Sequence, residues 1–206
     1  MPDGGFDPVR LAPAVERTDY VVKKGEVSLA VYRKRGGTGP RPVLFLVHGS
    51  SNSALSSFDL SAPGGEYSTM NVFAALGYDV WTMDHENYGR SSRTEGNSDI
   101  ASGVEDLIAA SALVIAETGQ AKMHMLGESS GALRAAAFAM ERPALVDRLI
   151  LNAFTYTGRN SPTLAKRSEQ LPLGTATVFP SNQCTASVAP LKCGASGLTR
   201  KMLHWS

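Results

Sequence analysis

The chain has 206 residues, of which 43% are hydrophobic and 19% charged, and its formal net charge is +1. This hydrophobic fraction can supply a folded core, so it excludes a wholly disordered chain. The near-neutral charge argues against a nucleic-acid-binding protein, which normally carries a clustered basic excess. The presence of just two cysteines excludes a disulfide-rich secreted scaffold.

The sequence contains no targeting or membrane signal. Residues 1–20 lack a basic segment followed by an apolar run, so no signal peptide is predicted. An uninterrupted stretch of about 18 apolar residues, which a membrane-spanning helix needs, is also missing. We therefore expect a cytoplasmic protein without a membrane span.

The first part of the chain predicts an extended arm, a hairpin and a buried strand. Residues 1–18 are rich in glycine and proline and form the arm. Two β-branched runs, 20–22 and 27–32, flank a turn at 23–26 and predict the hairpin. The continuous apolar run 42–47 is typical of a strand buried on both faces of a parallel sheet. The Ser/Asn-rich stretch that follows is expected to be a loop.

Helices and strands then alternate up to about residue 154. We expect helices over 67–76, 99–118 and 131–140, and Gly77 and Gly119 end the first two of them. We expect strands over 78–83, 122–126 and part of 145–154. This alternation predicts an α/β fold with a mostly parallel sheet and flanking helices.

A five-residue motif stands between the expected strand 122–126 and the helix after it. Gly127-Glu128-Ser129-Ser130-Gly131 fits G-x-S-x-G, and the strand–turn–helix context is that of a nucleophile elbow. Ser129 is then the predicted nucleophile, and the Ser130 N–H at the helix N-terminus is a predicted oxyanion donor. The plainer alternative is a tight turn where glycine only permits close packing.

Two further loops follow expected strands. His48 and Gly49 come directly after the strand 42–47, and we predict the Ser50 N–H as the second oxyanion donor. The alternative is an ordinary strand–helix loop, and in either case His48 is expected to brace it. The polar loop 84–92 could place Asp84 or His85 in catalysis, but holding the loop through hydrogen bonds is the simpler role.

Together these motifs resemble an α/β-hydrolase of the esterase, lipase or lysophospholipase type. The matching segments are VLFLVHGSS, DHENYGRSS, MLGESSGA and LILNAF, and the resemblance covers about residues 19–157. It implies a serine hydrolase in which Ser attacks a carbonyl, His transfers the proton, and Asp or Glu orients the His. A serine at the elbow argues against the aspartate-dependent dehalogenase and epoxide-hydrolase branches.

The resemblance also implies the chain order Ser, acid, His, which this sequence does not supply clearly. Glu141, Asp147 and Glu169 are the acids after Ser129, and none follows an expected strand. His124 lies within an expected strand and is interpreted as a core histidine. His204 alone follows Ser129 in the expected order, so it is the candidate base.

The last part of the chain departs from the pattern. Residues 170–206 contain no acidic residue, and from residue 171 neither helical nor strand periodicity is visible. We therefore expect residues 1–170 to form the N-terminal two-thirds of an α/β-hydrolase core. Residues 171–206 would be an atypical tail, disordered or foreign to the family through a frameshift or truncation, and the C-terminal strands of the fold would be missing.

The sequence thus predicts a hydrolase of carboxylic esters, with Ser129 as the nucleophile and a small ester-like molecule as the substrate. The alternative is a non-catalytic or truncated relic of the fold that serves as a binding module. No nucleotide or metal motif is present, so neither a cofactor nor a metal is expected. Cys184 and Cys193 are interpreted as free thiols rather than metal ligands.

Overall fold

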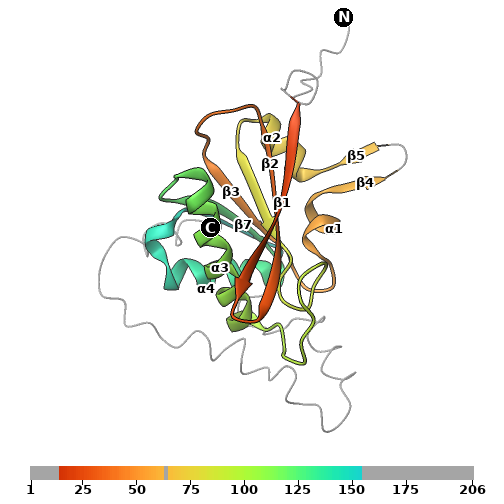
Figure 1. Ribbon diagram of the computed structural model, residues 1–206, viewed down its shortest axis with the longest axis vertical. Coiled ribbons are helices and arrows are strands. Elements are labelled where there is room, and N and C mark those ends of the chain that lie inside the picture. Colours follow the sequence, from red (N-terminus) through yellow and green to blue (C-terminus); the bar gives the residue numbers. More distant parts are fainter. Residues whose placement is uncertain (1–13, 63–64, 155–206) are drawn as a thin grey trace, which may run out of the picture. The chain divides into compact units, whose positions relative to one another are not determined.

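The computed structural model describes residues 14–62 and 65–154. The predicted tail 171–206, including both cysteines, lies outside the described residues. A six-stranded sheet in the order β1-β2-β6-β3-β7-β8 forms the centre (Figure 1). Its strands are β1 (Val15–Lys24), β2 (Val27–Gly36), β3 (Val43–Val47), β6 (Asp79–Met83), β7 (Met123–Glu128) and β8 (Val146–Asn152).

The sheet is mixed but mostly parallel. The hairpin β1–β2 turns at Gly25, whose φ of 58° favours glycine, and β2 pairs antiparallel with β6. The strands β6, β3, β7 and β8 pair in parallel. This arrangement confirms the predicted α/β class. Because parallel strands end at the same edge, the loops after β3, β6 and β7 meet there.

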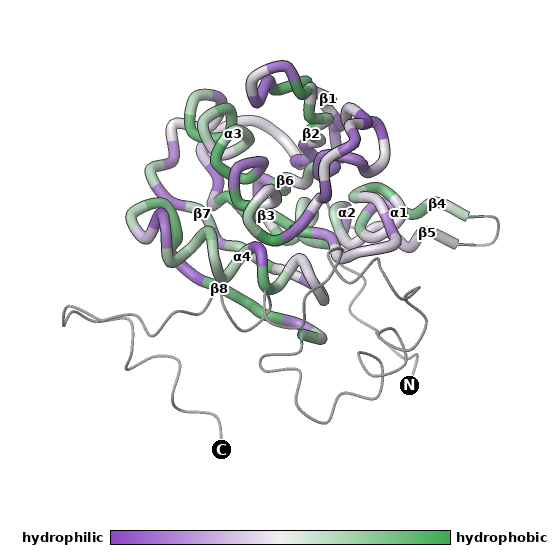
Figure 2. Tube along the Cα trace, turned by 90° about the horizontal axis from the view of Figure 1, so that it is seen from below, coloured by the Kyte–Doolittle hydropathy of each residue, from purple (hydrophilic) through white to green (hydrophobic). Residues whose placement is uncertain are grey.

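Helices cover both faces of the sheet (Figures 1 and 2). The helices α3 (Ile100–Thr118) and α4 (Ser130–Glu141) lie on one face, and the short helices α1 (Ala54–Phe58) and α2 (Thr69–Ala75) lie on the other. Each face has its own apolar core. One core joins α3 and α4 to Phe45, Trp81 and Met125, and the other joins α1 and α2 to Leu44 and Leu46. None of the described helices meets the length and hydrophobicity needed to span a membrane.

The segment after β3 is more ordered than predicted. Instead of one loop, it contains the helix α1 and a small hairpin of β4 (Leu60–Ala62) and β5 (Gly65–Tyr67). The expected helix 67–76 begins later, because the Ser68 side chain caps α2 by accepting a hydrogen bond from the Asn71 N–H. Elements of three to five residues are too short to show a period, so the sequence pattern missed them.

Candidate active site

Ser129 stands at the turn between β7 and α4. Its φ of 56° and ψ of −122° are unusual for a residue with a side chain, and the residue is exposed. The Ser129 N–H donates to the Asn152 carbonyl at the end of β8, at 2.9 Å. The turn therefore presents the Ser129 hydroxyl to solvent at the carboxyl edge of the parallel strands, where the G-x-S-x-G motif predicts a nucleophile.

The glycines of the motif have a steric reason. A Cβ on Gly127 would lie 2.5 Å from the Gly131 carbonyl oxygen. A Cβ on Gly131 would overlap the backbone at the end of β3, where the His48 carbonyl oxygen would be 2.5 Å away. Both positions therefore need glycine: Gly127 lets the strand turn closely into α4, and Gly131 lets the turn pack against the end of β3.

The loop after β3 lies directly against Ser129. Gly49 is buried, and a Cβ built on it would lie 3.0 Å from the Ser129 Cβ and 3.5 Å from the Ser129 Oγ. Ser50, the predicted second oxyanion donor, follows Gly49. Ser130, the predicted first donor, is the first residue of α4, where the amide groups have no partner within the helix. The two predicted donors thus belong to adjacent segments, and their role stays a prediction.

Asp84 holds the loop after β6. Its buried carboxylate accepts hydrogen bonds from the Tyr32 hydroxyl at 2.7 Å, the Ala54 N–H at 2.8 Å and the Arg90 N–H at 2.9 Å. A Cβ on Gly89 would overlap this carboxylate. Both carboxylate oxygens are occupied, so the geometry favours the loop-holding role over catalysis.

His48 and His85 are both buried behind the site, with no exposed surface. The His48 Nδ1 lies 2.7 Å from the Gly49 carbonyl oxygen, and its Nε2 accepts the His85 backbone N–H at 3.2 Å. The His85 Nδ1 lies 3.1 Å from Oδ2 of Asp106. Burial lowers the pKa of His48 to about 4 and that of His85 to about 3, so both rings are neutral near pH 7. As predicted, His48 braces its loop.

Sequence reasoning missed Asp106. It lies in α3 among Val104, Leu107 and Ala110, all buried. A carboxylate on the apolar face of a helix was the available signal, since a buried acid needs a partner.

The remaining acid and base candidates divide into two groups. Glu141 ends α4 and Asp147 lies near the start of β8, so neither is at the carboxyl end of a strand. Glu169 and His204 lie outside the described residues.

The interpretation of His124 as a core histidine was wrong. Its side chain is 21% exposed, and its Nδ1 lies 3.3 Å from Oδ2 of Asp147. Buried and partly buried residues alternate along β7, so the face of the strand that carries His124 is only partly covered.

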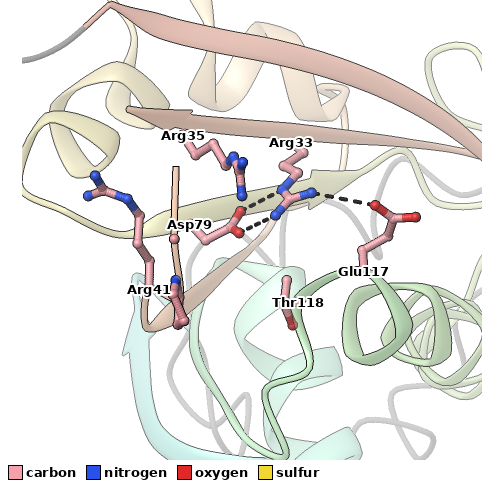
Figure 3. Close-up of a pocket in the computed structure, with 8 residues that line it drawn as sticks. Arg33, Arg35, Arg41, Asp79, Glu117 and Thr118 are labelled. Carbon is pink, nitrogen blue, oxygen red and sulfur yellow. Dashed lines mark hydrogen bonds and ion pairs between the residues drawn. The ribbon is translucent and has the colours of Figure 1, made fainter. Parts of the chain in front are cut away.

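A polar pocket of about 210 Å³ lies at the opposite, amino end of the parallel strands (Figure 3). Arg33 forms a two-point ion pair with Asp79, at 2.5 and 2.9 Å, and lies 3.5 Å from Glu117. This cluster ties β2 to β6 and α3 and is separate from the serine site. Among the described residues, no group of three potential metal ligands occurs.

Comparison with known proteins decides the family. The family model described as serine aminopeptidase, S33, matches residues 38–192, which is most of the chain. The chain belongs to this family of α/β-hydrolases. Solved structures agree in fold: 2-hydroxy-6-oxo-6-phenylhexa-2,4-dienoate hydrolase from Rhodococcus sp. strain RHA1 has a TM-score of 0.57 at 20% identity, covering 74% of this chain and 52% of that one. An epoxide hydrolase from Vigna radiata has a TM-score of 0.55 at 19% identity, covering 75% and 44%.

Two relatives are similar in sequence to this S33-family chain. It is 29% identical over 159 residues to 2-hydroxy-6-oxononadienedioate/2-hydroxy-6-oxononatrienedioate hydrolase 2 of Pseudomonas putida, covering 74% of this chain and 49% of the relative. It is 27% identical over 178 residues to Lipase 3 of Drosophila melanogaster, covering 80% and 44%. The chain therefore spans less than half the length of each of these relatives.

Proposed function

We propose that this chain hydrolyses small carboxylic esters through an acyl-enzyme formed on Ser129. The observation that carries the proposal is the conformation of Ser129. A serine with φ of 56° is exposed at the carboxyl edge of the parallel strands, between a strand and the first turn of a helix. Such strain persists at sites where it serves a function.

The chemistry follows from the groups beside Ser129. The Ser129 Oγ attacks the carbonyl carbon and its proton passes to a base, so a tetrahedral oxyanion forms. The Ser130 and Ser50 N–H groups stabilise that oxyanion. On its collapse the base returns the proton to the leaving oxygen, so the alcohol departs and an acyl group remains on Ser129. Water then attacks the acyl carbonyl and releases the carboxylic acid.

His204 remains the predicted base. Of the described histidines, His48 and His85 are fully buried and hydrogen-bonded within the protein, and His124 lies near the opposite end of β7. None of the three forms a hydrogen bond with Ser129. A cytoplasmic location also remains a prediction.

The relatives widen the range of substrates to test. Lipase 3 by its name acts on lipid esters, whereas the Pseudomonas putida relative hydrolyses a dienedioate. Both fit a serine that attacks a carbonyl carbon, but Ser129 does not fit the carboxylate nucleophile of epoxide hydrolysis. We therefore place esters first and ketone-activated carbon–carbon bonds second.

A binding module is the second candidate function. The observation that favours it is the lack of a base next to Ser129 among residues 14–62 and 65–154. Such a protein would keep the elbow for structural reasons and bind a carbonyl compound without cleaving it.

Hydrolysis of p-nitrophenyl esters of increasing acyl length tests the proposal. The intact chain should release p-nitrophenol, and Ser129→Ala should lower kcat by at least about a thousandfold, because the nucleophile is lost. Ser61→Ala is the matched control, since Ser61 is exposed on the strand β4. A folded protein whose rate is unchanged by Ser129→Ala would refute the proposal, and binding without turnover would support the second candidate.

A further inference from the structure

A chain of hydrogen bonds runs from the β1–β2 hairpin to the loop beside Ser129. We infer that Asp106, acting through His85 and His48, is a positioning residue that orients the oxyanion-binding amide of Ser50. This inference rests on the proposed function, because it assigns a role within the same site. It adds to the site Asp106, which lies outside the sequence motifs.

Both ring nitrogens of His48 form a hydrogen bond. The His85 backbone N–H donates to the His48 Nε2, so that nitrogen carries no proton. Neutral His48 therefore holds its proton on Nδ1, from which it donates to the Gly49 carbonyl at 2.7 Å. The described residues contain no cis peptide bond, and in a trans peptide the C=O and the following N–H point in opposite directions. By holding the Gly49 carbonyl, His48 fixes the direction of the Ser50 N–H.

Asp106 holds the other end of the chain. Its Oδ2 accepts hydrogen bonds from the His85 ring at 3.1 Å and from the Glu86 N–H at 3.0 Å. Both donors belong to the loop after β6, so one carboxylate oxygen sets the position of the His85 backbone N–H that His48 needs. The other oxygen, Oδ1, lies 2.5 Å from the Lys24 Nζ. Lys24 is held in turn by Glu86, at 2.7 Å.

Burial keeps both rings neutral, and the Arg134 charge acts in the same direction. Burial raises the pKa of Asp106, but the hydrogen bonds from His85 and Lys24 outweigh it, so the net pKa falls and the group is a carboxylate. Arg134 of α4 lowers the pKa of both rings. Asp84 and Asp106 raise the pKa of His48, although burial outweighs them. The Tyr88 ring packs on His48 with 5.0 Å between ring centroids.

Nitrogen NMR of the histidines tests this geometry without any enzyme assay. The chain contains four histidines, so labelled rings can be assigned by substitution. We expect His48 and His85 to carry their proton on Nδ1 and to stay neutral at pH 6. A proton on the His48 Nε2 in the intact chain would overturn the inference directly.

Asp106→Asn tests the positioning role in catalysis. An amide has a single acceptor oxygen, so it cannot serve both Lys24 and the pair His85–Glu86. We expect kcat for ester hydrolysis to fall about 10- to 100-fold, less than the loss of a whole oxyanion donor, with KM nearly unchanged. The control Asp147→Asn alters the other histidine–aspartate pair and should change neither parameter. If Asp106→Asn and Asp147→Asn had the same kcat, the inference would be contradicted.

Two substitutions of His48 separate positioning from simple packing. Asparagine places an N–H near the position of Nδ1 and can still donate to the Gly49 carbonyl, whereas glutamine places its amide near Nε2. The kcat of His48→Asn should therefore be at least about tenfold higher than that of His48→Gln. This factor is smaller than the loss in kcat that follows removal of a whole oxyanion donor. Equal losses would refute the inference. If the intact chain shows the expected tautomers but no Ser129-dependent turnover, the proposed function fails, and the positioning role fails with it.

Discussion

Gly131 illustrates how single atoms determine the site. It is the last residue of the G-x-S-x-G motif, and it packs against the carbonyl groups of Val47 and His48 at the end of β3. One added methyl group has no space there, so β3 and the elbow would have to separate. That separation would also move Gly49 away from Ser129.

Gly131→Ala should therefore lower the free energy of unfolding by roughly 1–3 kcal/mol, the usual cost of overpacking. Urea denaturation measures the change. Gly96→Ala is the control, because Gly96 lies in an exposed loop. A Cβ built on Gly96 would have the Thr94 Oγ1 as its nearest neighbour, at 3.3 Å. Equal stability of Gly131→Ala and the parent chain would show that the elbow is loosely packed.

The motif residues could be predicted from the sequence, but the network behind them could not. Ser129 and the flanking glycines form a local pattern whose spacing has a steric cause. Asp106 meets His85 across 21 positions of sequence, and Lys24 meets Asp106 across 82, so their contacts depend on the folded sheet. A single sequence carries no pattern that pairs such distant residues.

At the scale of elements, the ends of the long helix α3 follow their local chemistry. The Asp99 side chain accepts the Ser102 N–H at 2.8 Å, and Gly119 closes the helix with a φ of 66°. The sequence predicted this helix and its closing glycine because 19 residues show several turns of apolar period. The five-residue helix α1 and the hairpin β4–β5 have no such period and were missed.

Asp99→Ala should lower the free energy of unfolding by about 1 kcal/mol, because the first turn of α3 loses its cap. Glu105→Ala, on the exposed side of the same helix, should change it by less than about 0.5 kcal/mol. Thermal unfolding of both variants beside the parent chain measures the difference. If Asp99→Ala and Glu105→Ala lowered the free energy of unfolding equally, the Asp99 cap would stabilise α3 no more than an exposed residue does.

At the scale of the whole molecule, the buried histidines predict how stability depends on pH. The pKa values of His48 and His85 in the folded state, about 4 and about 3, lie below the ordinary 6.5. Between pH 6.5 and 4 the unfolded chain therefore binds more protons than the folded one, and acid favours unfolding. Because the pKa of Asp106 is lowered in the folded state, protonation of this group lowers the free energy of unfolding further at still lower pH.

The free energy of unfolding should fall as the pH is lowered from 6.5 to 4, with up to about 1.4 kcal/mol per pH unit from each buried ring. His48→Asn should make the slope shallower by one ring's share. Ser61→Ala, which removes no titratable group, serves as the control and should keep the parent slope. Urea denaturation at several pH values provides the test, and a slope that is the same with and without His48 would contradict a buried neutral ring.

The central claim is that Ser129 is an activated nucleophile, and an active-site fluorophosphonate probe tests it most directly. The probe forms a covalent bond with a serine that a base has activated, and mass spectrometry of peptides locates the modified residue. We predict one modification per chain, on Ser129, that disappears in Ser129→Ala. A soluble, folded chain that remains unmodified, or one that is modified equally in Ser129→Ala, would contradict the account.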